Sequence, residues 1–190
     1  MAKKYEFKPD KPYSGFFEKL ILTRLQQRNL LKWVLYALVL VALSVVQDVL
    51  FSRMRIYGAT TELVPCGIFM ICLLIGGERG SVFALIASFL YLFSGSAAGN
   101  YCVVFITGIA VLISLFRQAY LQRGFATAML CTGAAMLLYE LLVFAIGLFL
   151  GLTKVSAIGS FVLTAGFSLL AAPVLYPIVK AIGGGDAWKE

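Results

Sequence analysis

The chain has 190 residues, of which 61% are hydrophobic and 13% charged, and it contains no histidine. Charge-free runs of 37 residues (80–116) and 25 residues (155–179) have no polar face that could meet water. This composition excludes a water-soluble enzyme, and the lack of histidine excludes His-paired nucleophiles and His metal sites. We therefore expect an all-α, polytopic integral membrane protein.

The four cysteines all fall inside apolar runs, without a CxxC pair or the spacing of zinc ligands: Cys66, Cys72, Cys102 and Cys131. We interpret them as small apolar packing residues, and we expect neither a metal nor a cofactor.

Residues 1–32 are predicted to form a basic cytoplasmic tail. Within it, Phe17, Leu20, Ile21 and Leu25 recur at helical spacing, which predicts an amphipathic helix over residues 14–31. Such a helix lies on a membrane surface, and a docking helix for a cytoplasmic partner is the alternative.

Six membrane-spanning helices are predicted within a domain of residues 33–180, taking about 20 apolar residues per crossing. The run 80–116 is too long for one crossing and is split by a hairpin at 94–100, which is rich in serine and glycine. The spans are 33–52, 63–77, the two halves of 80–116, 124–153 and 155–179. Residues 181–190 would form a short cytoplasmic tail.

The basic residues predict the orientation. With six spans, thirteen of the sixteen lysines and arginines lie on the side of the two termini, and three (Arg53, Arg55 and Lys154) lie on the other. By the positive-inside rule both termini are cytoplasmic. The net charge of +7 is then explained by topology and contact with anionic lipid, without nucleic acid.

Glu140 is the most informative single residue, because it lies near the middle of the fifth predicted span. A charge at that depth costs at least about 2.5 kcal/mol, so the side chain must be protonated or must face protein or water. The open interpretations are a buried polar contact to a partner or neighbouring helix, a proton-linked switch, and a protonated carboxyl bonded to a helix backbone.

The other carboxylates near the spans have simpler explanations. Asp48 lies near Arg53 and Arg55, which favours an interfacial ion pair, and Glu62 and Glu78 each lie near an arginine at the ends of the second span. We expect no two carboxylates to share one membrane depth. An intramembrane enzyme would need Glu140 with a serine such as Ser168 or Ser160, so we expect a non-enzymatic protein.

Two segments resemble the rod-shape-determining MreD family: VQDVLFSRMRIYGATTEL over residues 46–63, and GGERGSVFALIASFLYLFSGSAAGNY over residues 76–101. Family-like positions are a glutamine at the end of the first helix, a glycine in the loop, the entry to the second helix, an Arg-Gly turn and a Ser-Gly-x-x-x-Gly hairpin. In this sequence they are Gln47, Gly58, Glu62, Leu63, Arg79, Gly80, Ser94, Gly95 and Gly99. Tyr91 stands where the family usually has an aspartate.

The resemblance covers about residues 34–123 and implies a non-enzymatic scaffold of the bacterial cell-elongation machinery in the inner membrane. Its implied partners are an MreC-like protein and, through it, the MreB filament and the peptidoglycan synthase of the elongation complex. Six short helices also resemble the substrate-binding S component of energy-coupling-factor vitamin transporters, whose architecture is similar to that of MreD. An S component is therefore the alternative function.

Overall fold

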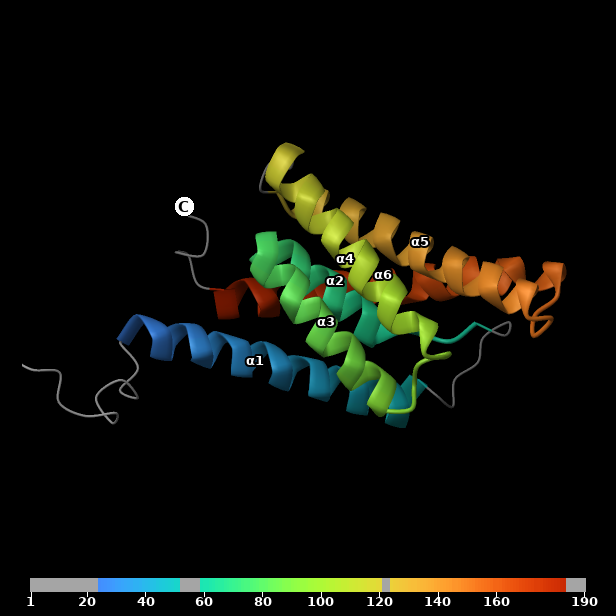
Figure 1. Cartoon of the computed structure of the whole chain (residues 1–190), viewed down its shortest axis with the longest axis horizontal. Coiled ribbons are helices and arrows are strands. Elements are labelled where there is room, and N and C mark those ends of the chain that lie inside the picture. Colours follow the sequence, from blue (N-terminus) through green and yellow to red (C-terminus); the bar gives the residue numbers. More distant parts are fainter. Residues whose placement is uncertain (1–23, 52–58, 121–123, 184–190) are drawn as a thin grey trace, which may run out of the picture.

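The computed structural model of the chain describes residues 24–51, 59–120 and 124–183 (Figure 1). Gly58, the terminal segment 184–190 and most of the predicted amphipathic helix over 14–31 lie outside the described residues.

Within the described ranges the chain forms six α-helices: α1 (Arg24–Val46), α2 (Leu63–Ile75), α3 (Gly77–Phe93), α4 (Tyr101–Tyr120), α5 (Phe125–Phe149) and α6 (Ile158–Gly183). A π-helical turn, η2 (Gln47–Phe51), continues α1, and a 3₁₀ turn, η3 (Val155–Ala157), precedes α6. The described part contains no strand. The predicted all-α class is confirmed.

Three stretches are long and apolar enough to cross a membrane: Asn29–Val49, Phe125–Phe149 and Val155–Gly183. They correspond to the first, fifth and sixth predicted spans. Shorter apolar helices cover Leu63–Ile75 and Tyr101–Arg117. At a rise of about 1.5 Å per residue, the 13 residues of α2 reach about 20 Å, which is less than the hydrocarbon core of a bilayer.

The first helix crosses the predicted boundary between residues 32 and 33 without a break, because no glycine or proline interrupts its sequence. Near that boundary two aromatic pairs join α1 to α3. The ring of Phe83 lies 5.6 Å from that of Trp33 and 6.0 Å from that of Tyr36. The start of the membrane segment is therefore held against the bundle by edge-on aromatic contacts.

Helix α2 forms the centre of the bundle and packs against each of the other five α-helices. Twelve consecutive residues, Leu63 to Leu74, are buried. Its sequence is apolar all round, as expected for a helix that is enclosed on every side. At Gly67 a Cβ atom would lie 2.6 Å from Cδ1 of Leu43, so α1 approaches the backbone of α2 closely there.

Glycines with positive φ reverse the chain between helices, as the sequence predicted for the turns after the second and third spans. Gly76 and Gly77 have φ of 65° and 58° between α2 and α3, and Gly95 has φ of 78° between α3 and α4. These left-handed conformations are costly for residues with a Cβ atom.

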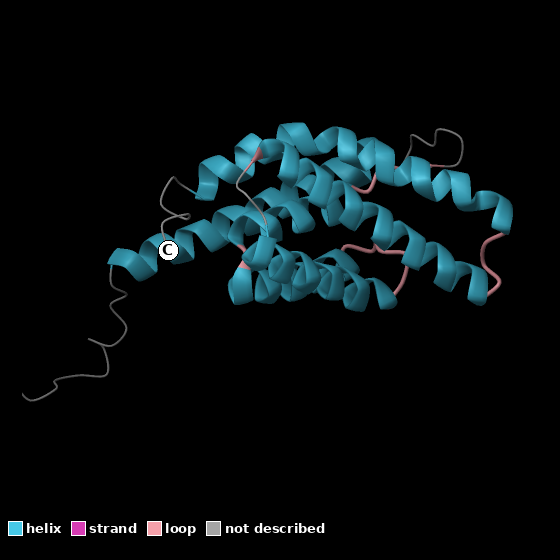
Figure 2. Ribbon diagram, turned by 90° about the horizontal axis from the view of Figure 1, so that it is seen from above, coloured by secondary structure: helices cyan, strands magenta, loops and turns pink. Residues whose placement is uncertain are grey.

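The helices run roughly along the long axis of the molecule, with α1 on one flank and α4 and α5 on the other (Figures 1 and 2). Their outer faces carry many exposed large apolar side chains, including Leu38 (62% exposed), Val104 (69%) and Leu170 (73%). In water such a surface would be a severe aggregation liability, whereas it matches the hydrocarbon of a bilayer.

Candidate functional site

A group of polar side chains, most of them buried, lies between the α3–α4 hairpin (residues 94–100) and the middle of α5. We call this group the polar cluster. Its members come from η2, the link before α2, and helices α3 to α6, and are Gln47, Glu62, Tyr91, Cys102, Tyr139, Glu140 and Ser168. Residues far apart in sequence therefore meet in one place.

Glu62 joins three elements. Its backbone N–H donates to Oγ of Ser168 in α6 at 2.8 Å, and its Oε2 accepts from the hydroxyl of Tyr91 in α3 at 3.4 Å. The Tyr91 hydroxyl also lies 3.3 Å from the carbonyl oxygen of Ser96 in the hairpin. The start of α2 is thus tied to both α3 and α6.

The predicted family-like residue Gln47 caps the same helix. Its Oε1 accepts from the backbone N–H of Val64 at 3.0 Å, and the side chain is 7% exposed. The first N–H groups of a helix have no partner within that helix, so this bond satisfies one of them. Gln47 therefore links the end of α1 to the start of α2.

Asp48 lies beside Gln47 and faces outward. Its Oδ1 accepts from the Oγ of Ser96 at 2.5 Å, a length typical of a hydroxyl bonded to a carboxylate. In turn, the Oγ of Ser94 donates to the carbonyl oxygen of Tyr91 at 2.7 Å. The bond from Ser96 connects the α3–α4 hairpin to the π-helical turn that continues α1, and the bond from Ser94 closes the end of α3.

Glu140 is 2% exposed, which confirms that it faces protein. Its Oε1 is buried without a hydrogen-bond partner, so the predicted bond to a helix backbone is not made by this atom.

Tyr139 fills the space beside Glu140. Its hydroxyl donates to Sγ of Cys102 at 3.4 Å, and its ring packs edge-on against Phe69 with centroids 6.2 Å apart. Tyr139 is fully buried and Tyr91 is 2% exposed, so both hydroxyls are enclosed by the bundle.

The remaining family-like residues are placed at the turns. Leu63 begins α2 and is buried, while Arg79 is exposed in the first turn of α3. At Gly80 a Cβ atom would lie 3.0 Å from the carbonyl oxygen of Cys72, and the thiol of Cys72 donates to the Gly80 carbonyl at 3.2 Å. Gly99 packs against the ring of Tyr101.

Sequence reasoning missed four members of the cluster. It placed Tyr91 only as a departure from the family pattern and Cys102 as packing, gave Tyr139 no role, and considered Ser168 only as a nucleophile. The Oγ of Ser168 instead donates to the Thr164 carbonyl at 2.8 Å while it accepts from Glu62. The spacing of Thr164 and Ser168, four residues apart on one face of a helix, was the available signal.

Comparison of this chain with protein-family models, with curated proteins and with solved structures finds no match.

Proposed function

We propose that this protein is a non-enzymatic scaffold in the inner membrane of a bacterium, with a role like that of MreD in cell elongation. The observation that carries the proposal is the use of polar side chains to join elements. Gln47, Asp48 and Ser168 each hold one segment of the chain against another. A framework fixed in this way suits a protein that acts by presenting rigid helix surfaces to partners.

Each of these bonds involves at least one residue of the two segments that resemble the MreD family. Gln47 and Glu62 belong to the first segment, and Ser94 and Gly95 to the second. The structure gives these family-like residues local roles as caps and turns, which supports the resemblance on physical grounds.

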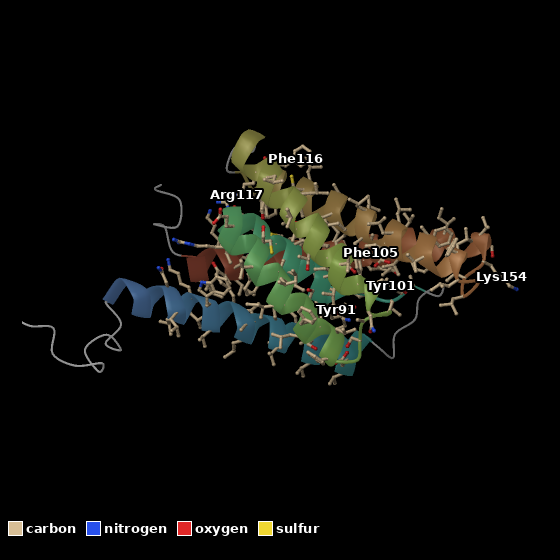
Figure 3. All side chains as sticks on the ribbon, viewed as in Figure 1. Tyr91, Tyr101, Phe105, Phe116, Arg117 and Lys154 are labelled. Atoms are coloured by element: carbon tan, nitrogen blue, oxygen red, sulfur yellow. The ribbon has the colours of Figure 1, made fainter. Side chains whose placement is uncertain are left out.

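The same proposal includes six spans with both termini in the cytoplasm. Arg117 lies over the α2–α3 turn, since a Cβ atom at Gly76 would overlap its guanidinium group. Arg117 and Lys154 lie near opposite ends of the molecule, with Tyr91 between them (Figure 3). Two basic residues assigned to the cytoplasmic side, Arg79 and Arg117, therefore flank one turn, as the positive-inside rule favours.

The exposed apolar faces would serve both lipid and partner helices. Helix α1 is the least enclosed of the three long apolar helices, with 11% of its most apolar window buried inside the bundle. A helix that is open along most of its length offers a broad surface for van der Waals packing, the main source of helix association in lipid.

The decisive experiment is depletion of the protein from a rod-shaped host, combined with purification of the tagged full chain in detergent. We expect depleted cells to become round or wide, and an MreC-like protein to co-purify. Complementation by a Glu78→Gln variant, which changes an exposed residue of the first turn of α3, is the matched control. Depleted cells that keep their shape, together with no elongation-complex protein in the purified sample, would refute the proposal.

The same purification tests the transporter alternative. A vitamin-sized molecule retained in a one-to-one ratio would support an S component instead of a scaffold.

A further inference from the structure

The end of the bundle where α2 turns into α3 brings a cationic side chain against the start of a helix. A Cβ atom at Gly76 would overlap the guanidinium group of Arg117, so this group lies directly over the α2–α3 turn. Figure 3 shows Arg117 near the end of the molecule opposite Lys154. Gly76 is the N-cap residue of α3, so the guanidinium group lies at the N-terminus of that helix.

A guanidinium group at a helix N-terminus is electrostatically unfavourable on its own. The aligned peptide dipoles place about half a positive charge at that end of a helix, which favours anions and disfavours cations. Glu78, the acidic residue in the first turn of α3, is exposed, and water and salt screen its charge. An anion bound between the guanidinium group and the helix end would stabilise both. Arg117 also has another interaction within the chain, but a guanidinium group carries five N–H donors and can serve an anion as well.

The backbone at the start of α3 offers further hydrogen-bond donors. The first hydrogen bond of the helix runs from the Gly80 N–H to the Gly76 carbonyl at 3.2 Å. The three N–H groups before it, those of residues 77–79, have no partner inside the helix. The N-cap residue is a glycine, which has no side chain that could accept from them. Helix N-termini of this kind bind phosphate and sulfate groups.

Ser114 supplies a second and independent donor from α4. The residue is 3% exposed, and its Oγ has no hydrogen-bond partner in the described part of the chain. A Cβ atom at Gly80 would lie 3.4 Å from this Oγ, so the hydroxyl faces the first turn of α3. Ser114 and Arg117 are three residues apart and therefore lie on the same face of α4.

Other buried hydroxyl groups in the bundle are oriented differently. Thr164 and Ser168 donate to carbonyl oxygens of their own helix, at 2.9 Å and 2.8 Å, and Ser88 does the same at 2.8 Å. Such bonds, about one turn back along the helix, are a common way for a helical hydroxyl to be satisfied. The Ser114 hydroxyl points to the neighbouring helix instead, where a ligand at the α2–α3 turn could accept from it.

The surroundings match the headgroup region of a membrane. Beside Arg117 on α4, Leu115 and Phe116 are each 59% exposed, so acyl chains can cover the outer side of this helix. Arg79, in the first turn of α3, is exposed at the same end of the bundle. Basic pockets between membrane helices bind the headgroups of anionic lipids.

We propose that the α2–α3 turn and the end of α4 form a binding site for a phosphate group. The guanidinium group of Arg117 and the N–H groups of residues 77–79 hold its oxygens, and the Ser114 hydroxyl donates from beside Gly80. The phosphate belongs to an anionic lipid headgroup or to a soluble phosphate ester, since both present the same oxygens. Phosphate binding goes beyond the scaffold function and does not depend on it, because ligand binding and partner co-purification are measured separately.

The test uses the purified full chain in a neutral detergent, with dioleoyl phosphatidylglycerol in one arm and sodium phosphate in another. Dioleoylglycerol, which has the same acyl chains but no phosphate, is the control for the lipid, and sodium chloride at the same ionic strength is the control for the salt. Unfolding temperature and native mass spectrometry report binding. Saturable binding in either arm supports the site. Binding of the phospholipid alone identifies a lipid headgroup, and binding of sodium phosphate alone identifies a soluble phosphate.

Three variants separate a specific site from general attraction between charges. Arg117→Gln should weaken binding at least about tenfold, the loss expected when a charge-assisted hydrogen bond is removed. Ser114→Ala should weaken binding about threefold or more, and it should fold like the wild type because the lost hydroxyl makes no hydrogen bond in the described chain. Lys180→Gln, at an exposed position in the last turn of α6, removes the same charge as Arg117→Gln and should bind like the wild type.

Three results would overturn the proposal. One is the lack of saturable binding beyond that of the controls in both arms. Another is equal weakening in Arg117→Gln and Lys180→Gln, which would indicate surface charge alone. The third is unchanged binding in Ser114→Ala, which decides the question by itself if Arg117→Gln folds poorly.

Discussion

Substitution of Gly80 by alanine tests the packing of the two helices that meet at the α2–α3 turn. A Cβ atom at this position would lie 3.0 Å from the Cys72 carbonyl oxygen and 3.5 Å from the Cys72 Cα. Both are backbone atoms of α2, so they cannot rotate away as a side chain would. Helix α3 must instead move outward by a few tenths of an ångström and weaken the contact between Cys72 and Gly80.

The magnitude follows from comparison with Gly108, a helical glycine whose Cβ would meet nothing within 4 Å. Alanine in place of a helical glycine stabilises by up to about 1 kcal/mol through propensity, and overpacking costs about 1–3 kcal/mol. If the propensity gains are similar at the two sites, the difference in stability between Gly80→Ala and Gly108→Ala isolates the packing cost. We expect Gly80→Ala to be less stable by about 1–3 kcal/mol.

The assay is thermal unfolding of the two purified variants and the wild type in the same detergent. For a chain of this length, about 2–4 °C per kcal/mol is expected, so Gly80→Ala should unfold several degrees below Gly108→Ala. Equal unfolding temperatures, or a more stable Gly80→Ala, would refute the close approach of α2 and α3 as the reason for this glycine.

Three further predictions concern the polar residues and the orientation. Glu140→Gln keeps the shape of the side chain and should fold like the wild type. Glu140→Lys should reduce membrane insertion or stability by about 2.5–3.5 kcal/mol, measured as yield and unfolding temperature. Equal yields and unfolding temperatures of the two variants would contradict the burial of this site. Gln47→Leu leaves the buried N–H of Val64 without an acceptor and should destabilise by about 1–3 kcal/mol, while Gln47→Glu retains an acceptor and is the control. In a chain without its native cysteines, a cysteine at Ala97 should react with an impermeant thiol reagent from outside the cell and one at Gln122 only from inside, and the reverse pattern would invert the topology.

The sequence by itself determined the class of the protein and most of its helices. Continuous apolar runs and glycine-rich turns are local signals, and they placed the reversals at 76–80 and at 94–100 where the structure has them. The sequence also singled out Glu140, because a charge near the middle of a span is costly unless the side chain is protonated or faces protein or water.

Only the tertiary structure decided which polar groups meet. Glu62 and Ser168, which are hydrogen-bonded, are separated by more than half of the chain, and neither helical periodicity nor hydropathy reports contacts at such a separation. The sequence also could not predict that α2 lies at the centre of the bundle. A helix that is apolar on every side has no polar face from which its orientation could be inferred. The polar cluster exists because the link before α2 is hydrogen-bonded to both α3 and α6, an arrangement set by the packing of the whole bundle.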